Sequence, residues 1–187
     1  VIKLIHGIAS VVNRDPRASN WIRVAFLPDY SVTRAQTLIP AADLNEQIST
    51  AGMEASGTGN MKFTLNGAPI VGTMDGANIE IFEEVGADNI YIFGNTAAEI
   101  ADLIPNYDPM SIYNAHADVQ RVVDALGDSI FCESEPGLFQ MFRDKVLDPN
   151  DPYLHLADFP SYIEIQDRVA QDATDHALFT KKAIMNV

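Results

Sequence analysis

The sequence predicts an α/β protein with a parallel sheet and flanking helices. Short β-branched runs alternate with helical patterns between residues 20 and 105, as in β–α–β units. A glycine-rich loop stands between one strand pattern and the next helix, where open α/β sheets bind ligands. The 187 residues are 47% hydrophobic and 20% charged, which suits a globular domain with a hydrophobic core.

The first elements are a helix, a strand and a second helix. Apolar residues recur at helical spacing over residues 2–12. The alternation and β-branching of WIRVAFL predict a strand over residues 21–27. Residues 31–39 are predicted to form a short helix, with Ser31 as its N-cap and Pro40 at its end.

The middle of the chain alternates strands and helices. Strands are predicted at residues 45–49, 68–74 and 89–94. A helix is expected from about Asn60 to the Asn66-Gly67 pair. Asp75 is expected to cap the helix that follows, and Gly86 to terminate it.

Helical patterns dominate the rest of the chain. Thr96 and Glu99 have the spacing of a capping box, in which each side chain bonds the backbone N–H of the other residue. Ser161 and Glu164 have the same spacing before another apolar periodic run. Both pairs are therefore predicted to begin helices.

The whole chain, residues 1–187, is expected to be part of one domain. It divides into an alternating α/β region up to about residue 105 and a mostly helical region from about residue 106. The chain starts at Val1 without a methionine, and helical patterns run into both ends. We therefore expect a fragment of a longer protein.

Composition narrows the function classes. The net charge of −14 disfavours a nucleic-acid partner, because an acidic surface repels phosphates. No apolar run is long enough for a membrane span. The single cysteine excludes an internal disulfide and favours the cytoplasm. Metal-ligand spacing is lacking, so no metal site is expected at the four histidines, His6, His116, His155 and His176.

The stretch EASGTGNMKFTLNG, residues 54–67, is the main candidate site. Lys62 follows the glycines and is the only lysine between Lys3 and Lys145. Free N–H groups at a helix start can bind an anion, and Thr58 adds a hydroxyl. The loop lacks the Walker pattern, and Lys62 replaces the third glycine of the dinucleotide fingerprint. Two readings remain: a phosphate cradle with an imine-forming lysine for pyridoxal phosphate, or a tight turn with a surface lysine.

A family resemblance rests on this stretch and its neighbours. EQISTAGMEASGTGNMKFTLNG, GTMDGANIEIFEEVG and IYIFG resemble glycogen, starch and maltodextrin phosphorylases. VVNRDP, FLPDYSV and LIPAAD upstream also resemble the family in order and spacing. The resemblance is close over residues 1–95 and looser afterwards, although DPYLHLADFPSYIEIQDRV still resembles the bacterial members.

The resemblance implies a fold and an activity. The family has two Rossmann-like domains facing a cleft, the type B glycosyltransferase fold, and this chain would be part of the second domain. Inorganic phosphate would cleave the terminal α-1,4 bond of a glucan and release glucose 1-phosphate with retained configuration. The cofactor is pyridoxal 5′-phosphate, whose phosphate group exchanges a proton with the substrate phosphate. The full-length proteins commonly form homodimers, and animal members are allosteric.

The resemblance also implies site residues. Lys62 would carry the cofactor covalently, with Thr58 and Gly59 binding its phosphate and Tyr30 beside it. The hydroxyls of the transferred glucosyl unit would be hydrogen-bonded by three residues of the loop, Glu54, Ser56 and Gly57. No catalytic residue beyond the anchor Lys62 is expected in this chain.

Other functions remain open at this point. In the family, the basic residues that hold the substrate phosphate lie upstream of this segment, so the 187-residue chain alone is expected to be inactive. One alternative is a domain of a nucleotide-sugar glycosyltransferase, which would bind a ribose-diphosphate and would not need Lys62. The other is a non-catalytic truncated fragment that folds without function.

Overall fold

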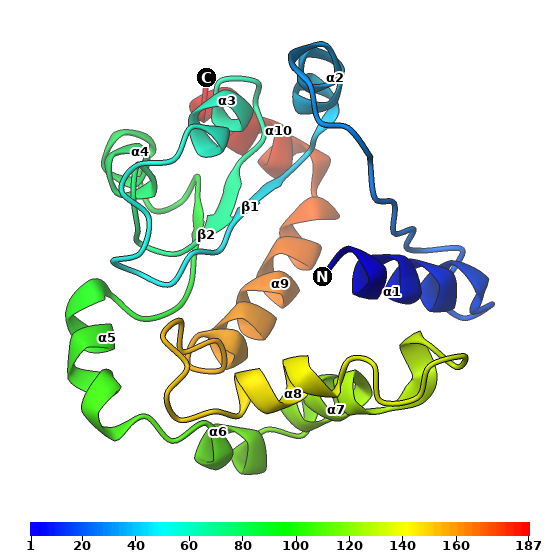
Figure 1. Ribbon diagram of the computed structural model, residues 1–187. Coiled ribbons are helices and arrows are strands. Elements are labelled where there is room, and N and C mark those ends of the chain that lie inside the picture. The colour runs from blue at the N-terminus through cyan, green and yellow to red at the C-terminus, as the bar shows by residue number, and fades with distance from the viewer. The chain divides into compact units, whose positions relative to one another are not determined.

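The computed structural model describes residues 1–187, which form two compact units (Figure 1). One unit comprises residues 1–30 and 109–151, and the other comprises residues 31–108 and 152–187. The first unit is helical, whereas the second contains the sheet. None of the helices is both long and apolar enough to cross a membrane.

The helical unit has four α-helices and a 3-10 turn. They are α1 (Ile2–Arg14), α6 (Pro109–Ala115), α7 (Ala117–Gly127), η3 (Ser129–Phe131) and α8 (Gln140–Val146). The N-terminal helix is where the sequence predicts it. Val119 and Val123 of α7 are fully buried, and Phe139, just before α8, is 4% exposed. The core of this unit therefore lies between α7 and α8.

The predicted strand over residues 21–27 is wrong. The segment from residue 22 has no regular secondary structure and pairs with no strand, and Trp21 is 88% exposed. The side-chain amide of Asn13 instead bonds the backbone of Val24. Its nitrogen donates to the carbonyl oxygen and its oxygen accepts from the N–H, both at 2.9 Å. Alternation in the sequence is not sufficient for a strand, because a strand also requires a neighbouring backbone to pair with.

The second unit contains a three-stranded parallel sheet. Its strands are β1 (Asn45–Gln47), β2 (Ile70–Gly72) and β3 (Tyr91–Ile92), in the spatial order β1-β2-β3. Asn45 pairs with Ile70, and Val71 pairs with Tyr91. The three strands fall inside the ranges predicted from the sequence, and their parallel pairing confirms the mixed α/β class. Each strand therefore ends at the same edge of the sheet.

Helices connect and cover these strands. They are α2 (Val32–Leu38), η1 (Ile39–Ala41), α3 (Gly59–Thr64), α4 (Asn78–Val85), α5 (Ala97–Leu103), η2 (Ile104–Asn106), α9 (Phe159–Ala173) and α10 (His176–Met185). α9 packs against the sheet through a buried cluster of Val71, Tyr91, Phe93, Ile165 and Val169. The apolar side chains of β2 and β3 are thus buried by a helix that is distant in sequence.

Two of the helix caps predicted from the sequence are present in the structure, and a third is not. The Ser31 hydroxyl accepts from the N–H of Arg34, and Thr96 forms a complete capping box with Glu99, as predicted. The capping box predicted for Ser161 is wrong, because α9 already begins at Phe159. The Ser161 hydroxyl donates to the carbonyl of Asp158 at 2.8 Å instead.

Candidate functional site

The loop between β1 and α3 carries most of the predicted site residues. Asp75, after β2, is 5% exposed and binds the first half of this loop. Its carboxylate accepts from the Ser49 hydroxyl at 2.9 Å and from the N–H groups of Gly52 and Glu54 at 2.8 Å each. Because β1 and β2 are adjacent and parallel, residues that follow them meet at one edge.

The expected role of Asp75 as a helix cap is wrong. The residue at the N-cap of α4 is Ala77, and no side chain caps this helix. The three donors of the neighbouring loop take up the carboxylate of Asp75. The sequence placed Asp75 correctly at a strand end but could not show which donors lie near it.

Two buried asparagines hold the second half of the loop, and the sequence analysis missed them. Asn78 donates to the carbonyl of Thr73 and accepts from the side-chain nitrogen of Asn60, both at 3.0 Å. The same nitrogen of Asn60 lies 3.3 Å from the carbonyl of Ser56. Both asparagines are 2% exposed. Each follows a glycine-containing turn before a helix, a pattern in which amide side chains commonly bond backbone groups.

Gly76 allows the loop to come close to the start of α4. The N–H of Ala77 donates to the carbonyl of Ser56 at 2.7 Å. A Cβ on Gly76 would lie 2.5 Å from that carbonyl oxygen, and Gly76 has a φ of +51°. Both sterics and backbone conformation therefore require glycine here.

The start of α3 presents free hydrogen-bond donors. The Thr58 side chain makes no capping bond, although Thr58 occupies the N-cap. The backbone N–H groups of Gly59 and Asn60 bond no acceptor within the chain. Helix N-termini with unbonded N–H groups attract anions. This arrangement has the donor chemistry that a phosphate group needs.

Lys62 lies one turn further along α3. Its N–H donates to the carbonyl of Thr58 at 3.3 Å, so the two residues occupy successive turns of one helical face. The Lys62 side chain is exposed, and its ammonium group has no hydrogen bond or ion pair. A lysine in this state is accessible to a reactive carbonyl compound.

The predicted sugar-binding residues lie on the exposed side of the same loop. Glu54 and Ser56 are exposed, and the N–H of Ser56 donates to the Glu54 carboxylate at 3.3 Å. Gly57 has a φ of +83°. One oxygen of the Glu54 carboxylate makes no hydrogen bond, and it can accept from a sugar hydroxyl.

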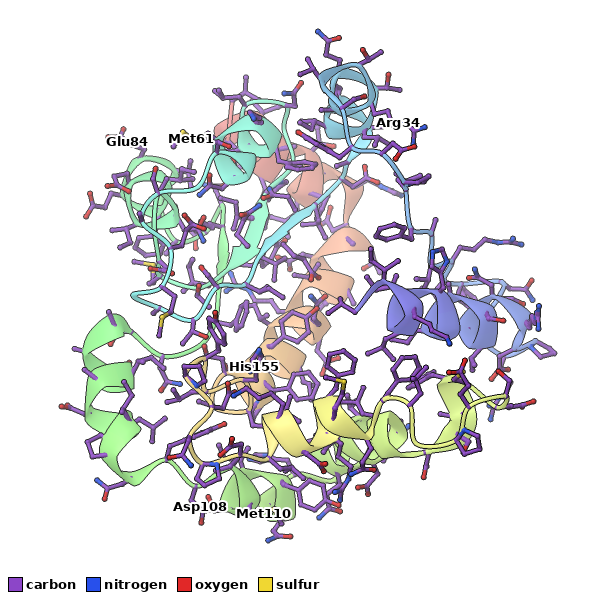
Figure 2. The ribbon with its side chains drawn as sticks, viewed as in Figure 1. Arg34, Met61, Glu84, Asp108, Met110 and His155 are labelled. Atoms are coloured by element: carbon purple, nitrogen blue, oxygen red, sulfur yellow. The ribbon has the colours of Figure 1, made fainter.

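A shallow pocket of about 270 Å³ borders this loop. It is lined by Ala55, Ser56, Met61, Gly76, Ala77, Glu80 and Ile81. Met61 extends from α3 toward α4, whose Glu84 points away from the sheet (Figure 2). The lining is mostly small and apolar, so the pocket leaves space around Ser56 without adding a cation.

Tyr30 and the four histidines are the remaining candidates from the sequence. Tyr30 belongs to the helical unit and is 75% exposed, whereas Lys62 belongs to the unit with the sheet. A contact of Tyr30 with a cofactor on Lys62 stays a prediction. No group of three or more His, Cys, Asp or Glu side chains is arranged to hold a metal ion.

Comparison with known proteins identifies the family of the chain. The sequence model of the carbohydrate phosphorylases matches residues 1–187. The chain belongs to this family, because the match covers its whole length.

The relatives are glycogen phosphorylases from bacteria and animals. The chain is 47% identical to the glycogen phosphorylase of Chlamydia trachomatis and 48% identical to that of Synechocystis, with all of the chain aligned. It is 43% identical to the muscle form from Rattus norvegicus. The chain spans 22–23% of the length of these relatives.

Proposed function

We propose that the chain is part of the C-terminal, cofactor-binding domain of an α-1,4-glucan phosphorylase. The complete enzyme would have the type B glycosyltransferase fold and use pyridoxal 5′-phosphate. Its substrates would be a glucan and inorganic phosphate, and its product glucose 1-phosphate. We also propose that the complete enzyme is a homodimer, on the basis of the family resemblance, and that it is cytoplasmic, on the basis of the single cysteine.

One observation carries this proposal. Lys62 is exposed and unpaired, and it follows a helix start whose donors are free. These groups fit the two ends of the proposed cofactor. The amine of Lys62 can bind the aldehyde carbon covalently, while the Thr58 hydroxyl and the Gly59 N–H can hold the phosphate. A surface turn without function would not require this combination.

In this proposal some residues of the loop hold the cofactor and others bind the sugar. When bound, the cofactor supplies a phosphate group that exchanges a proton with the substrate phosphate. Lys62 anchors the group, and the donors at Thr58 and Gly59 offset its negative charge. Glu54, Ser56 and Gly57 orient the glucosyl unit through its hydroxyls, because carboxylates and carbonyls are strong acceptors.

Labelling of the five lysines tests the proposal. The chain is incubated with pyridoxal 5′-phosphate, reduced with borohydride, digested and mapped by mass spectrometry. We expect the label on Lys62. Lys181 is the matched comparison, because it is also exposed and has no partner. Lys182 is 4% exposed and reports unfolding if it is labelled.

Two variants sharpen this experiment. Lys62→Arg keeps the positive charge but lacks a primary amine, so the specific label should disappear. Lys181→Arg should leave the labelling of Lys62 unchanged. A label spread evenly over Lys3, Lys62, Lys145 and Lys181 would contradict the proposal. The nucleotide-sugar alternative predicts such non-specific labelling, because its site does not use Lys62.

A further inference from the structure

Asn78 lies outside the proposed cofactor site but is connected to it. It is the first residue of α4, and its side-chain amide bonds Thr73 on one side and Asn60 on the other. Asn60 is the second residue of α3, directly after Gly59. A continuous series of buried hydrogen bonds therefore runs from the end of β2 to the start of α3.

The direction of this series is fixed by its two ends. The carbonyl oxygen of Thr73 can only accept, so Asn78 presents its nitrogen there and its oxygen toward Asn60. Asn60 must then donate to Asn78, and its own oxygen accepts from the N–H of Met61 at 2.9 Å. Reversing either amide would place like groups together in a buried site, which is costly.

The short length of α3 makes this support necessary. The helix has six residues, fewer than an isolated helix needs to be stable in water. Its first turn therefore depends on tertiary contacts for its orientation. The Asn60–Asn78 pair supplies such a contact between the free donors at Gly59 and the rigid end of the sheet.

The backbone of β2 lies close to the amide of Asn78. A Cβ on Gly72 would lie 2.9 Å from the side-chain nitrogen of Asn78 and 2.7 Å from the carbonyl oxygen of Gln47. A residue larger than glycine at position 72 would clash with the amide of Asn78. The amide therefore links the end of β2 to α3 through close packing as well as hydrogen bonds.

We propose that Asn78 is a positioning residue for the cofactor phosphate. It acts through Asn60 on the N–H donors at the start of α3, and it does not touch the cofactor. This inference rests on the proposed function. Its specific consequence is that Asn78 supports discrimination between pyridoxal 5′-phosphate and pyridoxal, which lacks the phosphate but has the same aldehyde.

The experiment compares the two aldehydes on the 187-residue chain. Labelling of Lys62 after borohydride reduction is measured with pyridoxal 5′-phosphate and with pyridoxal, and each rate is divided by that of Lys181. In the unmodified chain the phosphorylated compound should label Lys62 faster. In Asn78→Ala this preference should fall about tenfold, the effect of losing a buried hydrogen-bonded amide. The rate with pyridoxal should change little.

Asn89→Ala is the matched control. The amide of Asn89 donates to the carbonyl of Val85 at 2.7 Å, at the other end of α4. The variant removes a similar bond without touching α3, so the phosphate preference should persist. Urea unfolding of each variant measures its stability separately. Asn60→Ala should reproduce the effect of Asn78→Ala, and it provides the test if Asn78→Ala does not fold.

The outcomes separate the two proposals. If the unmodified chain shows no phosphate preference at Lys62, the proposed function fails, and the inference fails with it. If the preference exists but Asn78→Ala and Asn60→Ala keep it, only the inference is overturned. Equal loss in Asn78→Ala and Asn89→Ala would also overturn it, because general destabilisation would then explain the result. In the Asn60→Ala/Asn78→Ala double variant, the two effects should not add.

Discussion

Asp75 accepts three hydrogen bonds from a loop that precedes it by more than twenty residues in sequence. Asp75→Asn keeps the shape of the side chain but turns one acceptor oxygen into a donor that faces other donors. We expect the free energy of unfolding to fall by about 2–4 kcal/mol, because buried N–H groups lose their acceptor. Urea unfolding of the chain measures this loss.

The control for this prediction is Asp88→Asn. The Asp88 side chain is exposed, so the same chemical change should alter stability by less than about 0.5 kcal/mol. Equal stability of the two variants would show that the three bonds of Asp75 contribute nothing net.

The residues around the candidate site differ in what the sequence shows of them. The glycines and Lys62 stand out in the sequence, because a glycine loop at a strand–helix junction is typical of an anion site, and their role stays a prediction. Asp75, Asn60 and Asn78 could not be assigned their bonds. Their partners lie in the segments that follow the neighbouring strands β1 and β2, and a single sequence does not show how those strands pair.

Thr96 starts α5 with a complete capping box. Its hydroxyl accepts from the N–H of Glu99 at 3.3 Å, and the Glu99 carboxylate accepts from the N–H of Thr96 at 2.8 Å. Thr96→Ala should lower the free energy of unfolding by about 1 kcal/mol, because an N-cap hydroxyl is lost. Thr180→Ala, inside α10, should be neutral or slightly stabilising, because alanine favours helix interiors. Equal effects of the two variants in thermal unfolding would contradict this.

The stabilisation from the capping box of Thr96 and Glu99 should decrease at low pH. Bonds from the backbone and side chain of Thr96 lower the pKa of Glu99. A lowered pKa in the folded state means that the carboxylate stabilises the fold above its ordinary pKa. The contribution is lost as pH falls through the lowered value. The effect of Thr96→Ala should therefore shrink in strong acid.

Elements with local signals were predicted best. The helix caps at Ser31 and Thr96 and the three paired strands follow from side chains within a few residues. The failures at residues 21–27 and at Ser161 have different causes. The strand required a partner strand elsewhere in the chain, and Ser161 is not a cap because α9 begins two residues earlier, at Phe159.

At the scale of the whole molecule, buried charge ties the C-terminal helices to the sheet. The ammonium of Lys182, in α10, donates to the carbonyl of Asp88 and lies 3.4 Å from the Asp172 carboxylate of α9. It also lies 5.0 Å from the ring centre of Tyr91 in β3. Burial and the hydrogen bond to Asp172 raise the pKa of Tyr91, so its hydroxyl stays protonated.

Removing this cation should weaken the unit that contains the sheet. Lys182→Ala leaves the carbonyl of Asp88 without this donor. The partly buried Asp172 carboxylate loses its cation, so that only the Tyr91 hydroxyl still donates to it. We expect a loss of about 2–4 kcal/mol in urea unfolding. Lys182→Met should lose less, because it keeps the apolar stem. Lys181→Ala, at the adjacent exposed position, is the control. A loss in Lys182→Ala no larger than in this control would contradict the expectation.

In the helical unit, the side-chain amide of Asn13 also protects an unpaired backbone segment. It occupies the N–H and the carbonyl of Val24, the two groups that a neighbouring strand would use at that residue. Any strand that docks on this edge must displace one side chain and gains no net hydrogen bonds at Val24. Asn13→Ala would remove this competitor, and it should make residues 21–27 more prone to intermolecular pairing and aggregation.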